Sequence, residues 1–248
     1  MAVRFVQLTD THITAEGPVR GVDTAASFRA VVAAVERETP PPDFVLISGD
    51  LVNDARPESY AVLRDLLTAL PWPVRLAMGN HDDRAALRRI VLGEPEAADA
   101  PYRYAFAAGG TTFLVLDSWE RDTQAGRLDR AQLDWLDAEL ARSPGPAVVC
   151  VHHPPVPTGL EWIDRLRLVN GEALIEVLAR HANVRLLLCG HIHQVFETRV
   201  AGIPLLTTPS TCFQFGTRPD RLEISDERPG YRVVSLDDGR VATEVKRV

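Results

Sequence analysis

The amino-acid sequence predicts an α/β fold. Short apolar runs of strand length alternate with amphipathic stretches of helical period along most of the chain. Clusters of histidine, aspartate and asparagine follow five of the apolar runs directly. Towards the C-terminus, closely spaced strand patterns occur without long helices, which indicates antiparallel pairing in that part of the sequence.

Six apolar runs are predicted to be buried strands, because each is short, continuous and bounded by polar or turn-forming residues. They are Val3–Leu8, Phe44–Ser48, Val74–Met78, Phe113–Leu116, Ala147–Val151 and Val184–Cys189. The closely spaced C-terminal strands are predicted at Val195–Val200, Ile203–Thr208, Tyr231–Leu236 and Val241–Val248.

Four stretches place their apolar residues on one helical face. They are Ala25–Arg37, Glu58–Leu70, Asp129–Arg142 and Glu172–Arg180. The first of them aligns Phe28, Val31 and Val35, for example. The sequence contains no internal repeat and no low-complexity tract, and no composition shift marks a boundary. We therefore expect a single domain over residues 1–248.

Composition and charge exclude several classes of protein. Hydrophobic residues make up 46% and charged residues 25% of the chain, which is close to the globular average and argues against disorder. The apolar runs are far shorter than the roughly 20 residues of a membrane span, and no secretion signal is visible, so a cytoplasmic protein is expected. The net charge of −7 argues against a nucleic-acid partner, which needs a basic face. Cys150 and Cys189 end apolar runs and are expected to be buried thiols.

The residues that point to chemistry follow predicted strands at their carboxyl ends, where α/β sheets bind ligands. Six of the seven histidines lie in these clusters, and His181 is the exception. In chain order the clusters are Asp10-x-His12, Gly49-Asp50, Gly79-Asn80-His81-Asp82, His152-His153-Pro154-Pro155 and Gly190-His191-x-His193. Each cluster alone is also compatible with a turn or a surface loop. Together, at five strand ends, they predict one shared site.

The residue types in these clusters favour a site for two metal ions. Imidazole and carboxylate ligands suit Fe, Mn, Zn or Co. A carboxylate such as Asp50 can bridge two ions that lie about 3.5–4 Å apart. Such a pair makes hydroxide available near neutral pH and binds the oxygens of a phosphodiester, while a neighbouring histidine protonates the leaving oxygen. Gly49, Gly79 and Gly190 would permit close backbone approach beside these ligands.

This ordered set of motifs resembles the calcineurin-like metallophosphoesterase superfamily. The resemblance implies a four-layer α-β-β-α sandwich with a dinuclear metal site above the strand ends. One metal would be held by Asp10, His12, Asp50 and His193, and the other by Asp50, Asn80, His152 and His191. Asp50 and His81 would be the catalytic residues, with His81 contacting the phosphate and assisting the leaving group. Substrate binding would involve His12, Asn80, His81 and His193.

Further segments resemble bacterial 3′,5′-cyclic-AMP phosphodiesterases. They are Gly21–Thr24, His152–Asn170, Leu188–Gln194, Thr208–Phe215 and Pro229–Arg232. This resemblance implies hydrolysis of cyclic AMP to the 5′-nucleotide by hydroxide activated between two metals, with Fe and Mn as the expected ions and Zn or Co as alternatives. The expected partner is a small phosphodiester substrate, and a homodimer is a further prediction because relatives are often dimers. The alternatives are a glycerophosphodiesterase, another small phosphodiester hydrolase, and a non-catalytic nucleotide-binding scaffold.

Aromatic residues outside the metal motifs have two open interpretations. In one interpretation, Trp162 and Asn170 form a wall over a bound purine. In the other, Trp162 only packs in the interior of the protein. Phe213 and Phe215 stack on a base or fill the core.

Two other groups of polar residues have competing interpretations. Adjacent residues of an extended chain point in opposite directions, so we expect only one of His152 and His153 to bind metal, and the resemblance selects His152. Arg84, Arg88 and Arg89 clamp a phosphate or form a solvated helical face.

Overall fold

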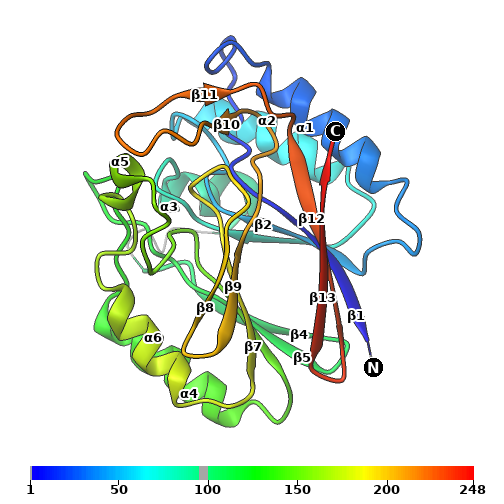
Figure 1. The fold of residues 1–248 in the computed structure, drawn as a ribbon. Coiled ribbons are helices and arrows are strands. Elements are labelled where there is room, and N and C mark those ends of the chain that lie inside the picture. Colours follow the sequence, from blue (N-terminus) through cyan, green and yellow to red (C-terminus); the bar gives the residue numbers. More distant parts are fainter. Residues whose placement is uncertain (1, 95–99) are drawn as a thin grey trace.

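Two β-sheets lie face to face in the computed structural model, and helices cover the outer face of each (Figure 1). The structure describes residues 2–94 and 100–248. This is the four-layer α-β-β-α sandwich that the resemblance implied, and the fold prediction is confirmed. Within the described ranges, no helix is both long and apolar enough to cross a bilayer.

The first sheet contains the strands that begin and end the chain. Its members are β1 (Val3–Leu8), β2 (Phe44–Ser48), β3 (Val74–Ala77), β12 (Gly230–Asp237) and β13 (Arg240–Arg247). Their order is β13-β12-β1-β2-β3, in which β1, β2 and β3 are parallel and β12 runs antiparallel to β1. The carboxyl ends of β1, β2 and β3 therefore meet at one edge.

The second sheet is built from the middle of the chain. Its members are β4 (Tyr104–Ala108), β5 (Thr111–Val115), β6 (Ala147–Cys150), β7 (Val184–Cys189), β8 (Glu197–Val200) and β9 (Ile203–Thr207). Their order is β4-β5-β6-β7-β9-β8, and β5, β6, β7 and β9 are parallel. A short separate hairpin consists of β10 (Gln214–Phe215) and β11 (Ile224–Ser225).

Four longer helices form the outer layers. On the first sheet lie α1 (Thr24–Val35) and α2 (Pro57–Thr68), and on the second lie α4 (Arg130–Arg142) and α6 (Gly171–Ala179). Asp23 and Asp129 begin α1 and α4 by accepting a backbone N–H three residues on, as good N-caps do. The remaining helical pieces are short: α3 (Arg84–Ala86), the π-helical turn η1 (Leu87–Val91) and α5 (Glu161–Asp164).

The central strands are buried on both faces, which explains why they are continuously apolar in the sequence. In β1, Val3 and Phe5 face the opposite sheet, whereas Val6 and Leu8 face the helices. Cys150 packs between the sheets and Cys189 faces the helical layer, so both thiols are buried as predicted.

The sheets differ from the sequence-based expectation in several features, and the β10–β11 hairpin was not predicted. The C-terminal pairs β8–β9 and β12–β13 are antiparallel as predicted, but β9 also pairs in parallel with β7. Strand β4 was not predicted, because it lies at a sheet edge and its burial alternates from residue to residue instead of forming an apolar run.

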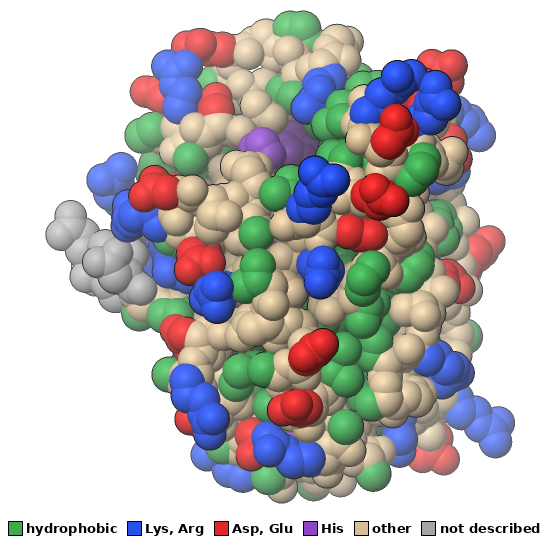
Figure 2. Space-filling model, turned by 60° about the vertical axis from the view of Figure 1, so that its left-hand side comes forward, with side chains coloured by type: hydrophobic (Ala, Val, Ile, Leu, Met, Phe, Trp, Pro, Cys, Tyr) green, Lys and Arg blue, Asp and Glu red, His purple; other side chains and the backbone are tan. Residues whose placement is uncertain are grey.

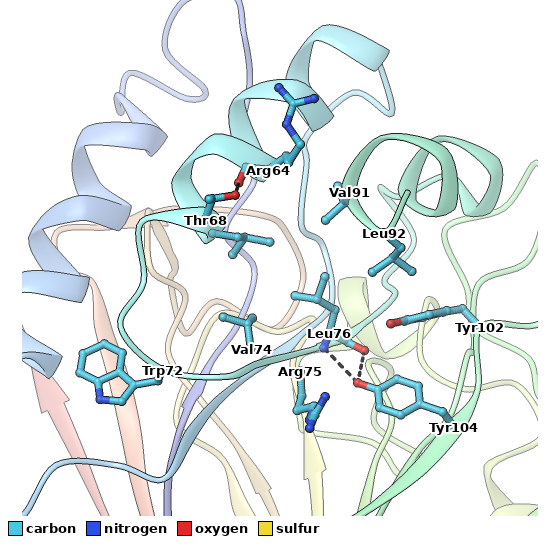
Figure 3. A pocket seen from close by; sticks show the side chains of 11 residues that line it. Arg64, Thr68, Trp72, Val74, Arg75, Leu76, Val91, Leu92, Tyr102 and Tyr104 are labelled. Atoms are coloured by element: carbon cyan, nitrogen blue, oxygen red, sulfur yellow. Dashed lines mark hydrogen bonds between the residues drawn. The ribbon is translucent and has the colours of Figure 1, made fainter. Parts of the chain in front are cut away.

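The free edge of β3 is covered by a side chain from the other sheet. The Tyr104 hydroxyl accepts the Leu76 N–H at 3.0 Å and donates to the Leu76 carbonyl at 2.9 Å. Figure 3 shows this contact beside an apolar pocket that Leu76, Leu92 and Tyr102 help to line. The contact satisfies backbone groups that would otherwise be exposed at a strand edge.

A buried glutamine joins the two sheets directly beneath the strand ends. Gln7 is fully buried, and its amide donates to the Ser48 hydroxyl at 2.8 Å and to the Cys189 carbonyl at 3.0 Å. Its side-chain oxygen accepts from the Thr208 hydroxyl at 2.6 Å. All of these partners lie within two residues of a strand-end cluster or in the facing loop after β9, so Gln7 fixes how the two sheets meet.

Replacing Gln7 should reveal the value of this junction. Gln7→Met keeps the length of the side chain but leaves the Cys189 carbonyl and the Thr208 hydroxyl without their partner. We expect the free energy of unfolding of the metal-free protein, measured in urea, to fall by about 2–4 kcal/mol. A loss below about 0.5 kcal/mol would show that water or neighbouring groups replace the amide.

Candidate metal centre

The five strand-end clusters converge on one site between the two sheets. Loops after β1, β2 and β3 approach from the first sheet, and loops after β6 and β7 approach from the second. Histidine side chains are visible at the base of a hollow in the surface (Figure 2). The predicted metal ligands are all at most 9% exposed: Asp10, His12, Asp50, Asn80, His152, His191 and His193.

The backbone of these loops is strained at the predicted ligands. Five of them have a positive φ, between 44° and 73°, in the left-handed region that non-glycine residues rarely adopt: Asp10, His12, Asp50, His191 and His193. The loops after β1 and β2 hold one another in place, because the Asp10 N–H donates to the Gly49 carbonyl and the His12 N–H to the Asp50 carbonyl, each at 3.0 Å. The surrounding fold thus overrides local preference to aim these side chains inward.

The glycines of the motifs leave room for the ligand side chains. A Cβ on Gly79 would collide with the Asp50 carboxylate, and a Cβ on Gly49 would collide with the His152 ring. At Gly190 a Cβ would meet the Thr9 hydroxyl and the Asp10 carboxylate. The close approach predicted from the sequence is therefore present at all three glycines.

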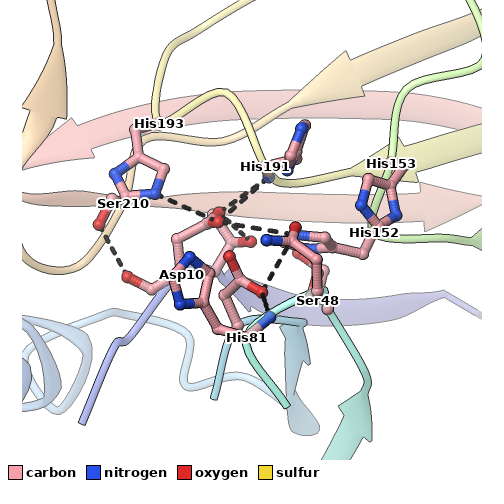
Figure 4. A network of polar contacts seen from close by, with 12 residues as sticks. Asp10, Ser48, His81, His152, His153, His191, His193 and Ser210 are labelled. Atoms are coloured by element: carbon pink, nitrogen blue, oxygen red, sulfur yellow. Dashed lines mark hydrogen bonds and ion pairs between the residues drawn. The ribbon is translucent and has the colours of Figure 1, made fainter. Parts of the chain in front are cut away.

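One half of the site is formed by Asp10, His12 and His193, whose potential ligand atoms lie within 4.8 Å of one another. The Nδ1 of His193 donates to the Phe213 carbonyl at 2.8 Å, so its Nε2 carries the free lone pair. That Nε2 lies 3.4 Å from Asp10 Oδ1 (Figure 4). It lies 3.1 Å from His12 Nε2. This is the set that the resemblance assigned to the first metal, together with Asp50.

The other half is formed around His152 and Asp50. The Nδ1 of His152 donates to the Ser48 carbonyl at 2.8 Å, which leaves Nε2 facing the site, 3.4 Å from Asp50 Oδ1 and 3.9 Å from Asp10 Oδ1. Asp50 also lies 3.6 Å from His12 through its other oxygen. Its carboxylate therefore stands between the two halves, where a bridging ligand belongs.

Unused lone pairs show that this site fits metal ions. Among the described residues, the buried atoms without a hydrogen-bond partner include three from predicted ligands: Asn80 Oδ1, His152 Nε2 and His191 Nε2. Buried polar atoms are normally paired, and an unpaired one costs free energy. Three in one cluster, all of types that bind metals, are explained if cations complete them.

His153 lies within the cluster but is already engaged. Its ring centroid is 4.6 Å from that of His191, and its nitrogens are close enough to join His152 and His191 around an ion. However, Nδ1 pairs with the Ser118 hydroxyl at 2.7 Å and Nε2 with the Gln124 carbonyl at 3.1 Å. These contacts favour His152 over His153 as the ligand, in agreement with the sequence-based choice.

His81 is placed beside the predicted ligands and faces the cavity. Its backbone N–H donates to Asp50 Oδ1 at 2.9 Å, and its Nδ1 pairs with the Asn53 carbonyl at 2.7 Å. Because a carbonyl only accepts, Nδ1 carries the proton and Nε2 is left for a ligand. His81 lines the cavity together with the predicted substrate-binding residues His12, Asn80 and His193.

In the metal-free cluster, Asp50 and His152 shift one another's pKa in opposite directions. Burial would raise the pKa of Asp50, but the charges of His152 and His81 outweigh it and hold that pKa well below the usual value. Burial would lower the pKa of His152, yet Asp50 outweighs it and raises the pKa to about 9. Burial lowers the pKa of His12 to about 3, so this imidazole is neutral and ready to bind a cation.

Two residues that are not predicted metal ligands hold the ligand loops. The Asp82 carboxylate accepts the backbone N–H groups of Leu51, Val52 and Gly79, which ties the loop after β2 to the loop after β3. Gln124 accepts from Asn80 Nδ2 at 2.7 Å, which turns Asn80 Oδ1 toward the site. Asp82 belonged to a recognised cluster, but Gln124 lies in an irregular loop where no sequence pattern marks it.

The side chains with open interpretations are now placed. Trp162, Phe213 and Phe215 line the cavity, which has a volume of about 150 Å³. Asn170 does not, since it pairs with the backbone of Leu128.

The remaining charged candidates lie outside the cavity lining. Arg84 pairs with Asp117 and Arg88 with Glu94. Neither they nor Arg89 line the cavity, so the phosphate clamp is not supported. His181, two residues after the end of α6, pairs with Asp137 on α4 and does not line the cavity.

Changing Gln124 should weaken the metal site without touching a ligand. Gln124→Leu removes the acceptor that orients Asn80, and we expect a loss of metal affinity of about 10- to 100-fold. Metal content after dialysis against a chelator series measures this. Gln124→Glu keeps an acceptor and should retain most of the affinity. Equal retention by both variants would mean that Asn80 needs no such support.

Metal binding should release a proton near neutral pH. His152 is protonated in the metal-free protein at pH 7, and a cation at Nε2 must displace that proton. Apparent affinity should therefore rise up to about pH 9. Calorimetry in buffers of different ionisation enthalpy counts the protons. His152→Asn should abolish this release, and His181→Asn, remote from the site, should keep it. Binding without proton release at pH 7 would contradict the assignment.

The same raised pKa has a consequence for the metal-free fold. A histidine whose pKa is higher in the folded than in the unfolded chain stabilises the fold fully below its unfolded value, here 6.5. This contribution is lost as pH rises through about 9. The free energy of unfolding of the metal-free protein, compared at pH 6 and pH 10, measures this contribution. In His152→Asn the part of the difference that comes from this histidine should disappear.

Comparison with known proteins places this geometry in a family. A family model described as calcineurin-like phosphoesterase matches residues 3–195. The chain is 37% identical over 253 residues to a 3′,5′-cyclic-nucleotide phosphodiesterase of Nostoc sp., covering 100% of this chain and 93% of that protein. It is 38% identical over 252 residues to the 3′,5′-cyclic adenosine monophosphate phosphodiesterase CpdA of Pseudomonas aeruginosa, covering 100% of this chain and 90% of that protein.

A solved structure shows the same fold. The crystal structure of a dimetal phosphatase from Danio rerio superimposes with a TM-score of 0.69 at 20% identity, covering 99% of this chain and 98% of that one. The sequence match spans every cluster from Asp10 to His193, and the fold agrees over nearly the whole chain. This chain belongs to the calcineurin-like phosphoesterase family.

Proposed function

We propose that this protein is a metal-dependent phosphodiesterase that hydrolyses 3′,5′-cyclic nucleotides, with cyclic AMP as substrate, to the 5′-nucleotide. The observation that carries the proposal is the convergence of seven buried donor residues, several with unused lone pairs, at the base of a surface cavity. The activity printed for full-length relatives at 37% and 38% identity supports the choice of substrate.

The chain offers the residues that hydrolysis of a phosphodiester requires. When bound, a metal pair supplies positive charge to the phosphate oxygens and lowers the pKa of water. Asp10, His12, Asp50 and His193 would hold one ion, and Asp50, Asn80, His152 and His191 the other. Fe and Mn are the proposed ions and Zn or Co the alternatives, because imidazole with carboxylate suits all of them.

His81 is the proposed general acid. Its Nδ1–H stays on the Asn53 carbonyl, which fixes the ring, and its backbone N–H stays on Asp50. A proton on Nε2 can then pass to the oxygen that leaves phosphorus, which in a cyclic nucleotide is the 3′ oxygen of the ribose. The donor enters the cavity from beside the Asp50 carboxylate, where the two halves of the site meet.

Other predictions about the whole protein stand beside this proposal. We propose that residues 1–248 form one domain, which is supported by the pairing of β1 with β12 across the length of the chain. A homodimer, a cytoplasmic location and the absence of a nucleic-acid partner stay predictions. Light scattering, cell fractionation and a DNA-binding assay test them in turn.

A substrate panel tests the proposed activity. Protein loaded with Mn²⁺ or Fe²⁺ should hydrolyse cyclic AMP, with 5′-AMP as the product identified by chromatography. Glycerophosphocholine in the same assay tests the glycerophosphodiesterase alternative through the ratio of kcat/KM values. Tight binding of cyclic AMP without turnover in metal-loaded protein would instead support the non-catalytic scaffold.

His81 variants separate chemistry from metal binding. His81→Ala should keep both metals, because the alanine retains the backbone N–H to Asp50, but should lower kcat for cyclic AMP about 10²- to 10⁴-fold. Metal analysis and steady-state kinetics on one sample measure the two effects. Asp50→Asn should lose metal and activity together. An unchanged kcat in His81→Ala would remove His81 from the mechanism.

A further inference from the structure

Aromatic rings line the cavity on the side of the first metal half-site. Phe215 stacks on His193 with ring centroids 4.1 Å apart and planes 20° apart. Trp162 meets Phe215 edge to face at 5.0 Å. The rings thus form a continuous wall from the predicted metal ligand His193 outward to Trp162, and Leu222 lies at the same cavity.

Two chain segments that are far apart in the sequence build this wall. Trp162 is on α5, and its backbone N–H donates to the carbonyl of Pro219 in the β10–β11 hairpin at 3.2 Å. Leu160 and Ile163 pack on Ile192, between the two histidines of the last motif. Figure 1 shows α5 next to the hairpin on one side of the molecule. The wall therefore depends on elements that neither sheet contains.

The indole of Trp162 has one unmet requirement. Its Nε1–H is buried and has no hydrogen-bond partner among the described residues. A buried donor without an acceptor is costly, and a tryptophan used only for packing usually finds a partner for it. Because this N–H points along the plane of the ring, its partner would be an acceptor at the edge of the indole and not a base stacked on the ring face.

The size of the cavity indicates what this wall contacts. Its volume of about 150 Å³ is smaller than the roughly 300 Å³ at which sites for drug-sized ligands begin. The base of the cavity would suit the phosphate group once the proposed metal ions offset the negative charge of Asp50. A larger substituent on the phosphate must then extend past Phe215 and Trp162, where an aromatic ring gains stacking and an aliphatic alcohol does not.

We propose that Trp162, supported by Phe215, is a stacking platform for the nucleobase and makes the site prefer nucleoside phosphates over phosphates of aliphatic alcohols. The inference rests on the proposed function for its substrate and assigns the preference to residues outside the metal motifs. It predicts that Trp162 strengthens binding of the base. It also predicts that Trp162 does not affect binding of the phosphate group.

Binding of products tests this without depending on turnover. Calorimetry on metal-loaded protein compares adenosine 5′-monophosphate with ribose 5-phosphate, which lacks the base. The wild type should bind the nucleotide about tenfold or more tightly. Trp162→Leu should bring the two affinities together by weakening only the nucleotide, with metal content unchanged. Trp162→Phe should keep an intermediate preference, because it retains a ring and loses the N–H.

A tryptophan elsewhere provides the control. Trp72→Leu changes a partly buried indole at the pocket of Figure 3, outside the metal cavity, and should keep the wild-type ratio of affinities. The inference is overturned if Trp162→Leu keeps that ratio or if both ligands weaken equally. A wild type that prefers the nucleotide but does not hydrolyse cyclic AMP would refute the proposed activity and leave the base platform standing.

Discussion

Buried carboxylates and imidazoles without enough hydrogen-bond partners are the constraint on which the rest of this structure depends. Asp10 and Asp50 are at most 2% exposed, and they face imidazoles whose other nitrogens already bond to backbone carbonyls. Charged groups are kept in such surroundings only if they are paired or bind metal. The proton on His152 meets part of this demand in the metal-free protein. The positive φ values and the glycines are consistent with it, since each gives up local stability to bring a donor atom inward.

Much of the fold follows from the sequence, because the strands are buried on both faces and so appear as continuous apolar runs. Strand β1 is predicted to the residue, and α4 begins one residue after the predicted start because Asp129 is its cap. Strand β4 is not predicted from the sequence, because an edge strand with alternating burial contains no continuous apolar run. The parallel pairing of β9 with β7 is not predicted either, because the register and the neighbours of a strand depend on how the sheets pack and not on the local sequence pattern.

The candidate site divides in the same way. The metal motifs are visible because each follows directly on an apolar strand, and the structure brings all of them together, although the binding of metal itself stays a prediction. Gln124 and the stacked arrangement of Phe215 on His193 are not visible, because they come from loops whose positions only the tertiary fold determines. One cavity thus combines the proposed phosphate end, built on strand ends, with an aromatic end built on α5 and a hairpin. Families that share a fold differ in activity through such peripheral elements.

The central claim is that two cations complete this cluster with Asp50 between them. The most direct test is anomalous X-ray scattering from crystals of protein loaded with Mn²⁺. The account predicts two peaks about 3.5–4 Å apart, one beside Asp10, His12 and His193 and the other beside Asn80, His152 and His191. A single peak, or peaks away from these side chains, would contradict it.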